Sequence, residues 1–158
     1  MSEKFVASGG NHLNGEKGRI VDTDIIVDTL RGVQASRDYL RRFELGELEG
    51  RLSVVSIAEL FAGKGSRDPI VAKRLESFIN LFTVLPVDAE IARKAGELVR
   101  DYGLSLPDAL IGATALTLGL VLVTCNVRDF SRIPTFVWRC LTDDLPKSDS
   151  RFGRRDGL

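Results

Sequence analysis

The sequence predicts an α/β fold with three layers, in which a central and mostly parallel sheet is covered by helices on both faces. Short apolar runs alternate with longer segments whose apolar residues recur at helical spacing, and this alternation is typical of parallel sheets. The 158 residues fit one domain with an ordinary hydrophobic core. We assign that domain to residues 19–145, preceded by a flexible leader (1–18) and followed by a polar tail (146–158).

The first half of the chain predicts two strands, each followed by helical segments. RIVDT is a short apolar run with polar residues at its end, as expected of a buried strand, and the helix after it stops at Gly32. The next segment alternates charged and apolar residues with helical period and ends near Gly50. The expected elements are a strand at 19–23, helices at 24–30 and 36–48, a strand at 52–55 and a helix at 57–62.

The second half continues the alternation of helices and strands. Pro86 indicates the end of a third strand, and Gly103 closes the helix that follows. The segment from Ala109 to Val127 has no charged residue, but Gly119 divides it into a helix and a buried strand, so we expect a soluble, cytoplasmic protein with no membrane contact. The expected elements are helices at 69–82, 88–102 and after Pro107, strands at 83–87, 120–124 and 136–140, and a loop before the last strand.

Composition restricts the chemistry that this chain can perform. Lys and Arg number 22 and Asp and Glu number 22, so contact with nucleic acid must come from a local basic rim rather than from net charge. The single histidine, His12, lies in the polar leader, which argues against Ser-His or Cys-His catalysis and against His-ligated zinc. Two cysteines, Cys125 and Cys140, are too few for a disulfide scaffold. If the chain is an enzyme, carboxylates must carry the chemistry.

Four acidic residues follow predicted strands or open helices at one edge of the sheet. Asp22 ends the first strand, Glu59 lies shortly after the second, Asp108 opens a helix, and Asp129 follows the strand LVLVT. Ligands of such sheets gather beyond the carboxyl ends of the strands. Converging carboxylates repel one another unless a cation relieves the repulsion, and oxygen-only ligands suit Mg²⁺ or Mn²⁺. We therefore expect these four acids to form a metal and catalytic site.

Each acid also has a purely structural interpretation. Ser56-x-x-Glu59 and Ser105-x-x-Asp108 both match the helix capping box, and Asp129 stands where aspartate often terminates a strand. Asp22 is harder to explain in this way, because an acid beside a buried strand carries a desolvation cost unless something pairs with it. A capping position near a helix N-terminus can still point its carboxylate at a metal, so the two interpretations are compatible.

Two further acids compete with Asp22, and we rank both below it. Asp28 is expected to be solvated one helical turn further on, and Asp24 to act as a helix cap or to stand behind the metal ligands. The run IVDTDIIV also resembles the Asp-x-Asp opening of haloacid-dehalogenase-like phosphatases, in which Asp22 would be the nucleophile and Asp24 the general acid. That resemblance leaves SIAEL and the pair Asn126-x-x-Asp129 unexplained.

Four segments in order resemble the PIN-domain nucleases, and specifically the VapC toxins of bacterial and archaeal toxin–antitoxin pairs. They are IVDTDIIVDTLRG (20–32), SVVSIAELFAG (53–63), LPDALIGATAL (106–116) and LVTCNVRDF (122–130), and the likeness runs from Arg19 to about Cys140. It implies a PIN-like fold and a Mg²⁺-dependent endoribonuclease that hydrolyses RNA phosphodiester bonds, with Mn²⁺ as another metal. Asp22, Glu59, Asp108 and Asp129 match the family's acidic metal-binding positions, and Thr124 and Asn126 match supporting polar positions.

The resemblance also implies partners. Members of the family usually form homodimers and are silenced by a small antitoxin that blocks the acidic cleft. Arg31 and Arg128 lead the candidates for a rim that holds the RNA backbone; Lys64, Arg67 and Arg132 are further candidates, and any one of them is more simply read as solvated surface. Cys125 departs from the family pattern, which often has a basic residue there, and Arg128 is placed to compensate. The non-enzyme alternative is an inert PIN fold that binds RNA or a protein.

Overall fold

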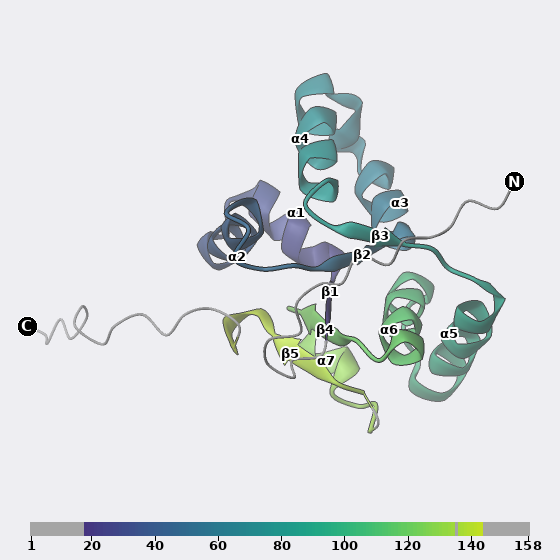
Figure 1. Ribbon diagram of the computed structural model, residues 1–158. Helices are drawn as coiled ribbons and strands as arrows, with labels where there is room; N and C mark the ends of the chain where they lie inside the picture. Colours follow the sequence, from purple (N-terminus) through teal and green to yellow (C-terminus); the bar gives the residue numbers. More distant parts are fainter. Residues whose placement is uncertain (1–17, 135, 144–158) are drawn as a thin grey trace, which may run out of the picture.

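Figure 1 shows the computed structural model, which describes residues 18–134 and 136–143. The predicted polar tail and all of the predicted leader except Gly18 lie outside the described residues. Five short strands form one sheet in the order β3-β2-β1-β4-β5, and every neighbouring pair is parallel. The strands are β1 (Arg19–Val21), β2 (Arg51–Ser53), β3 (Thr83–Leu85), β4 (Val121–Thr124) and β5 (Trp138–Cys140). The predicted parallel sheet is confirmed.

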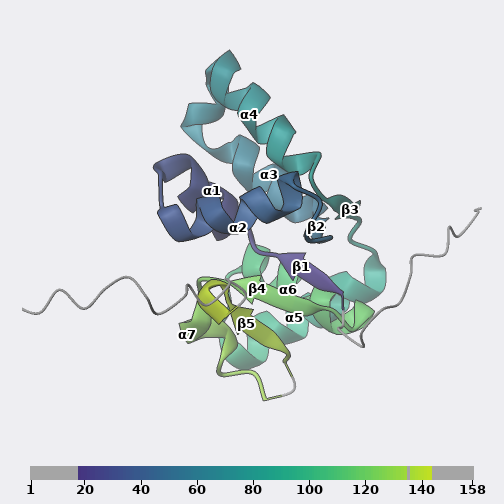
Figure 2. The same ribbon diagram turned by 60° about the vertical axis from the view of Figure 1, so that its left-hand side comes forward.

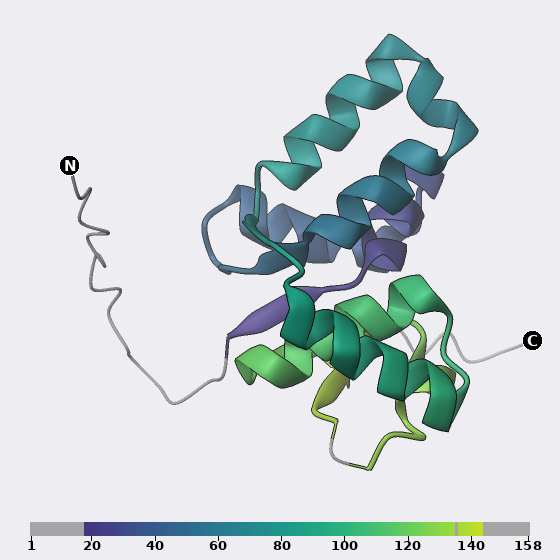
Figure 3. The same ribbon diagram turned by 90° about the vertical axis from the view of Figure 1, so that its right-hand side faces the viewer.

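Helices cover the two faces of this sheet, which gives the predicted three layers (Figures 1 and 2). One face carries α1 (Thr23–Arg31), α2 (Gln34–Glu44) and α4 (Pro69–Ile79). The other face carries α5 (Ala89–Tyr102) and α6 (Leu106–Leu118), which pack side by side (Figure 3), together with the short α7 (Val127–Phe130). The remaining elements are α3 (Val54–Ala62) and the short 3₁₀ helices η1 (Lys64–Arg67) and η2 (Leu141–Asp143).

The central strands supply side chains to two separate hydrophobic cores, because successive residues of a strand point to opposite faces. Ile20 and Leu122 pack among the residues of α5 and α6. Their neighbours Val21 and Val123 pack on the other face, among residues of α1, α2 and α4. All four side chains are fully buried. The near-continuous apolar runs of β1 and β4 are therefore explained by burial on both faces.

The second strand is shorter than predicted, and the helix after it begins earlier. The hydroxyl of Ser53 accepts a hydrogen bond of 3.2 Å from the amide of Val55, which makes Ser53 the N-cap of α3. Val54 and Val55 consequently belong to the first turn of the helix and not to the strand. Their β-branched side chains favour strands, but the serine cap in front of them decides the local structure. A second difference is α7, a single turn of helix where a loop was predicted.

The uncharged segment from Ala109 to Val127 is divided as predicted. It holds most of α6, then Gly119, then β4 and the start of α7. Gly119 has φ 64° and ends α6 by a left-handed turn that glycine adopts without strain. Across residues 18–134 and 136–143, no helix combines the length and the apolar character that crossing a membrane requires.

Candidate active site

Asp22 lies directly after β1, where its carboxylate is held by two donors. It is the N-cap of α1, and only 3% of its surface is exposed. The amide of Thr23 donates to Asp22 Oδ1 over 2.8 Å, and the hydroxyl of Thr124 donates to Asp22 Oδ2 over 2.7 Å. Thr124 Oγ1 also accepts from the amide of Asn126 over 2.9 Å. The predicted supporting role of Thr124 beside the first acid therefore agrees with its position at the end of β4.

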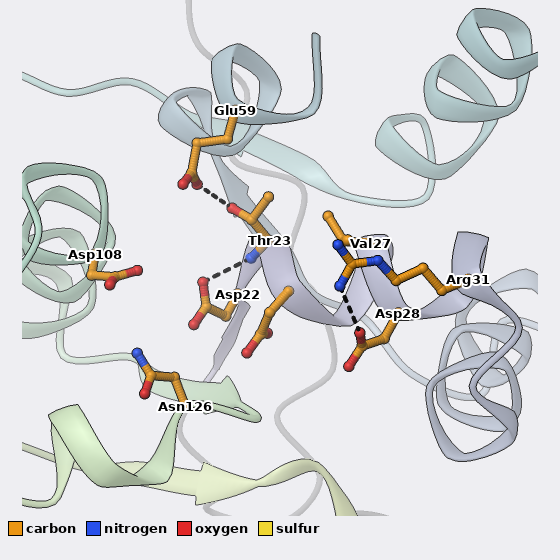
Figure 4. A pocket seen from close by; sticks show the side chains of 9 residues that line it. Asp22, Thr23, Val27, Asp28, Arg31, Glu59, Asp108 and Asn126 are labelled. Atoms are coloured by element: carbon orange, nitrogen blue, oxygen red, sulfur yellow. Dashed lines mark hydrogen bonds and ion pairs between the residues drawn. The ribbon is translucent and has the colours of Figure 1, made fainter. Parts of the chain in front are cut away.

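A cavity of about 330 Å³ opens in front of Asp22 at the carboxyl edge of the sheet. Side chains from α1, α3, α6 and the loop after β4 converge on it (Figure 4). The cavity is lined by Asp22, Thr23, Asp24, Val27, Asp28, Arg31, Glu59, Asp108 and Asn126. Three of the four predicted acids thus share one cavity, although α1, α3 and α6 are far apart in sequence.

Glu59 reaches the cavity from the second turn of α3, where a hydroxyl of α1 holds it. Thr23 Oγ1 lies 2.6 Å from Glu59 Oε2 and 2.8 Å from Ser56 Oγ. The predicted capping role of Ser56 is wrong, because Ser53 caps α3 and Ser56 lies inside the helix with its hydroxyl directed at Thr23. Glu59 is therefore available to the cavity and is not engaged in a capping box.

Asp108 enters the cavity from the first turn of α6. Ser105 is the N-cap of this helix, and its hydroxyl accepts a hydrogen bond of 3.3 Å from the Asp108 amide. The capping interpretation of Ser105 is therefore confirmed, while the Asp108 carboxylate lines the cavity and points toward Asp22 (Figure 4). The helix N-terminus favours a negative charge at this position. The motif Ser105-x-x-Asp108 therefore both caps α6 and places a carboxylate in the cavity.

Asp129 is placed differently from the other three acids. It lies on α7 and is not among the residues that line the cavity. Asn126 Nδ2 donates to Asp129 Oδ2 over 3.0 Å, and Arg132 forms an ion pair of 3.2 Å with Asp129 Oδ1. Asn126 itself does line the cavity, so Asp129 touches the site through this amide side chain. Its role as a metal ligand remains a prediction.

Asp24 and Asp28, which the sequence argument ranked lower, both line the cavity. Asp24 Oδ2 accepts from the Cys125 amide over 3.1 Å, whereas Asp24 Oδ1 is buried with no hydrogen-bond partner among the described residues. Asp28 lies one turn further along α1 and forms a 3.9 Å ion pair with Arg31. The spacing of the three acids in DTDIIVD, at the start of one helix, was the available signal for a shared position.

The charges in the cavity act on one another. Burial is the largest cause that raises the pKa of Asp22 well above its ordinary value, followed by the charge of Asp24; hydrogen bonds from Thr124 and Thr23 oppose it. Burial likewise raises the pKa of Asp24 to about 6 and also raises that of Glu59. The charge of Asp108 contributes to all three upward shifts. These carboxylates therefore form one electrostatic cluster whose leading neighbouring charges are negative.

Such a cluster fits a hydrated divalent cation. No three His, Cys, Asp or Glu side chains within the described ranges are grouped so that they alone surround an ion. Mg²⁺ does not require such a cage, because it keeps several waters and is commonly held through one or two carboxylates together with substrate phosphates. Oxygen donors, mutual repulsion and the unpaired Asp24 Oδ1 all suit Mg²⁺ or Mn²⁺ better than zinc.

Of the predicted basic rim, Arg31 is the residue that borders the cavity, and its side chain is 73% exposed. Arg128 is exposed on α7, and Lys64 and Arg67 are exposed on η1, but none of these three lines the cavity. Arg132 is engaged with Asp129. A contact of Arg128 with substrate therefore remains a prediction.

Cys125 does not supply a nucleophile to this site. Burial and the charges of Asp24 and Asp28 raise the pKa of its thiol to about 12, so the thiol stays protonated at neutral pH. Its contribution to the site is its backbone amide, which holds Asp24. The Cys125 side chain is not among those that line the cavity.

Comparison with known proteins places the same segment in a defined group. The model of the PIN domain family matches residues 19–135. Ribonuclease VapC10 of Mycobacterium tuberculosis is 40% identical over an alignment of 118 residues, which covers 70% of this chain and 84% of that protein. A toxin-antitoxin complex from Klebsiella pneumoniae matches with a TM-score of 0.62 and 27% identity over 76% of this chain and 96% of that chain. A DNA-bound VapBC from Salmonella typhimurium matches with a TM-score of 0.64 and 25% identity, over 79% and 98% of the two chains.

Proposed function

The chain belongs to the PIN-domain family and resembles its VapC members throughout the described domain, and from this premise we propose that it is a Mg²⁺-dependent endoribonuclease, the toxin of a VapBC-type pair. One observation carries the proposal: Asp22 at the end of β1, Glu59 on α3 and Asp108 on α6 meet in one cavity at the carboxyl edge of the sheet. Mutual repulsion of this kind is costly without a cation. The relative from Mycobacterium tuberculosis is named a ribonuclease, which supports RNA as the substrate.

Some side chains of the cavity would bind the metal, and others hydrogen-bond these metal ligands. We propose that Asp22 and Asp108 bind the metal directly. Glu59 and Asp129 complete the acidic set, and Asp129 contacts the site through its hydrogen bond with Asn126. Bound Mg²⁺ would supply an acidified water and neutralise charge on the attacked phosphate; Mn²⁺ would serve in the same way. Asp22 cannot rotate freely, because both of its oxygens are hydrogen-bonded. Burial raises the pKa of Glu59, and the hydrogen bond from Thr23 opposes this shift.

The RNA backbone contacts Arg31, the basic residue beside the acids of the cavity. Arg31 stands at the mouth of the cavity, on the turn of α1 that follows Asp28. Its guanidinium is only loosely paired, at 3.9 Å from Asp28, and its side chain is exposed, so it is available to a phosphate. Arg128 is a second candidate on α7. Sequence preference depends on contacts beyond these two residues.

An acidic cavity of this size also suits a protein inhibitor. A basic side chain, above all an arginine, would satisfy the carboxylates that otherwise repel one another. Two of the solved structures that this chain resembles are described as a toxin-antitoxin complex and as VapBC bound to DNA. We propose a small VapB-like antitoxin as the partner and a homodimer as the assembled form of this chain.

Two alternatives have less support. The phosphatase interpretation rested on the run IVDTDIIV alone, and membership of the PIN-domain family explains that run together with the segments around Glu59 and Asp108. An inert module that binds RNA or protein would not need to retain all the acids that line the cavity. Retention of Asp22, Glu59 and Asp108 in one place favours an enzyme.

The decisive test is cleavage of labelled total cellular RNA by purified, partner-free protein, with Mg²⁺ and with EDTA. Wild type is compared with Asp108→Asn and with Asp101→Asn, a control in which the same change removes an acid that pairs with Arg100 on the surface of α5. We expect discrete fragments from wild type and Asp101→Asn in Mg²⁺ only, and none from Asp108→Asn. Equal activity of wild type and Asp108→Asn at saturating Mg²⁺ would rule out the site, and a folded wild type that cleaves nothing would favour the inert module.

A further inference from the structure

The buried hydroxyls of Thr23 and Ser56 form a short series of hydrogen bonds that ends at the Glu59 carboxylate. Thr23 begins α1 and is 7% exposed, and Ser56 on α3 is fully buried. The Thr23 hydroxyl lies between Ser56 Oγ, at 2.8 Å, and Glu59 Oε2, at 2.6 Å (Figure 4 shows the Glu59 contact). Neither hydroxyl entered the site predicted from the sequence. We propose that Thr23 and Ser56 are positioning residues that fix the carboxylate of Glu59 in the cavity.

The direction of the two hydrogen bonds that link Ser56, Thr23 and Glu59 follows from the number of protons available. A threonine hydroxyl has one proton and two lone pairs, whereas an ionised carboxylate can only accept. Thr23 must therefore donate to Glu59, and its own lone pair accepts from Ser56. The order Ser56 to Thr23 to Glu59 is the arrangement in which each of the two buried hydroxyls has a partner. A hydrogen bond to an ionised acceptor is also the stronger kind, as the 2.6 Å distance indicates.

Glu59 needs such a restraint more than the other acids do. Its side chain has three rotatable bonds and leaves the middle of α3, and the residue is only half-buried. Asp22 and Asp108 have short side chains, and both stand at a helix N-terminus. Thr23 is the one hydrogen-bond donor to the Glu59 carboxylate among the described residues. This hydrogen bond opposes burial and the charge of Asp108, which both raise the pKa of Glu59.

Thr23 contacts both Asp22 and Glu59. Its amide donates to Asp22 Oδ1 over 2.8 Å while its hydroxyl holds Glu59. Both carboxylates are therefore hydrogen-bonded to the same residue, at the start of α1. Partners that orient metal ligands commonly change metal affinity or activity by about 10-fold to 100-fold when removed. This inference rests on the proposed function, in which Glu59 belongs to the metal-binding set.

The test uses the full chain and three threonine variants. Thr23→Val keeps the shape and removes the hydroxyl, and Thr23→Ser restores the hydroxyl. Thr29→Val is the matched control, because Thr29 is a buried threonine of the same helix whose hydroxyl donates to the Ile25 carbonyl of its own helix. Binding of Mn²⁺ alone is measured by titration calorimetry, and cleavage of RNA is measured as kcat and KM. We expect Thr23→Val to weaken Mn²⁺ binding and lower kcat by about 10-fold each with KM unchanged, and Thr23→Ser to stay within about twofold of wild type.

A second comparison separates positioning from general stability. In a Glu59→Gln background, Thr23→Val should cause no further loss of Mn²⁺ affinity, because the group through which it acts is already changed. Ser56→Ala should give a smaller loss in the same direction and serves if Thr23→Val does not fold. The proposal is overturned if folded Thr23→Val keeps wild-type Mn²⁺ affinity and kcat. If Thr23→Val does not fold, the same result in folded Ser56→Ala overturns it. Additive losses in the Glu59→Gln background would also contradict the proposal. If wild type binds Mn²⁺ but cleaves no RNA, the proposed function fails while the calorimetric test of positioning still stands.

Discussion

Thr124 and Asp22 stand 102 positions apart in the chain, yet the hydroxyl of Thr124 donates a 2.7 Å hydrogen bond to Asp22 Oδ2. This bond joins the ends of β4 and β1, which are neighbours in the sheet. The same hydroxyl accepts from the amide of Asn126, so it also determines where the loop after β4 begins. The position of the most buried acid therefore depends on one side chain of the neighbouring strand.

Thr124→Val should weaken both the fold and the site. The change leaves a buried carboxylate oxygen without its donor, and such a loss costs about 1–3 kcal/mol of stability. It also removes the hydrogen bond that lowers the pKa of Asp22. Urea unfolding and RNA cleavage measure the two effects. Thr114→Val is the control, because the hydroxyl of that buried threonine donates to the Leu110 carbonyl of its own helix. Thr124→Ser should recover both properties, and equal behaviour of the two valine variants would contradict the role assigned to Thr124.

Asp24→Asn should stabilise the metal-free protein at neutral pH. Burial raises the pKa of Asp24 to about 6, so the folded state binds this proton more tightly than the unfolded chain. The resulting stability is complete below about pH 3.8 and is lost as the pH rises through about 6. The Tm of wild type in EDTA should therefore fall across this window relative to Asp24→Asn, whose amide oxygen can still accept from Cys125. Asp38→Asn on the exposed face of α2 is the control, and a constant Tm difference from pH 4 to pH 7 would exclude this explanation.

Mg²⁺ should stabilise the wild-type protein. A ligand that binds only the folded state adds about 1.4 kcal/mol at ten times its Kd, which raises Tm by about 2–6 °C for a chain of this size. Asp108→Asn should lose most of this gain, because Asp108 is a proposed ligand whose charge also acts on Asp22, Asp24 and Glu59. Thermal melts with and without Mg²⁺ test the effect. The same shift in wild type and Asp108→Asn would place the ion elsewhere.

Asp129→Asn should reduce cleavage less than Asp108→Asn does. Asp129 lies outside the cavity and reaches it through Asn126, whereas Asp108 lines it directly. We expect about a 10-fold loss of kcat for Asp129→Asn and no detectable cleavage for Asp108→Asn. Arg132→Ala keeps Asp129 and removes its ion pair, so it serves as the control for α7. Equal losses in Asp129→Asn and Asp108→Asn would mean that Asp129 reaches the metal itself.

Arg31→Ala should raise the KM for RNA several-fold and make it less sensitive to salt, while kcat changes little. Arg31 borders the cavity with an exposed guanidinium, and each lost phosphate contact reduces the salt dependence of binding by about one ion. Arg128→Ala changes an exposed arginine that does not line the cavity and should have the smaller effect. The measurement is KM at several salt concentrations. A larger effect of Arg128→Ala would shift the RNA path toward α7.

The parallel sheet and the edge at which the acids meet could be predicted from sequence, because buried strands and glycine helix ends leave strong local patterns. Asp22, Glu59 and Asp108 were identified for the same reason: each follows a strand or opens a helix. The exact start of α3 was not predictable from propensity, since the two valines after Ser53 favour a strand and only the serine cap reveals the helix.

The support behind the acids was harder to predict. Ser56 matched a capping box, and nothing local shows that its hydroxyl instead meets Thr23, 33 positions away. The sequence ranks Asp24 below Asp22, because Asp22 alone accounts for the acid after the strand. Only the fold shows that the Cys125 amide binds Asp24 Oδ2 and that Asp24 Oδ1 is buried without a partner among the described residues. Such relationships depend on packing between distant elements, which no short segment encodes.

The pairing of β1 with β4 has a consequence for the order of events during synthesis. Asp22 is synthesised at the start of the domain, whereas Thr124 and Asn126 follow only after most of the domain has been made. Until β4 pairs with β1, Asp22 lacks the Thr124 donor and its cavity lacks the part of the wall that Asn126 supplies. Pairing of such distant parallel strands is a slow step of folding. A growing chain therefore carries no assembled acidic site. For the ribonuclease proposed above, this topology delays activity against the cell's own RNAs until translation of the domain is nearly finished.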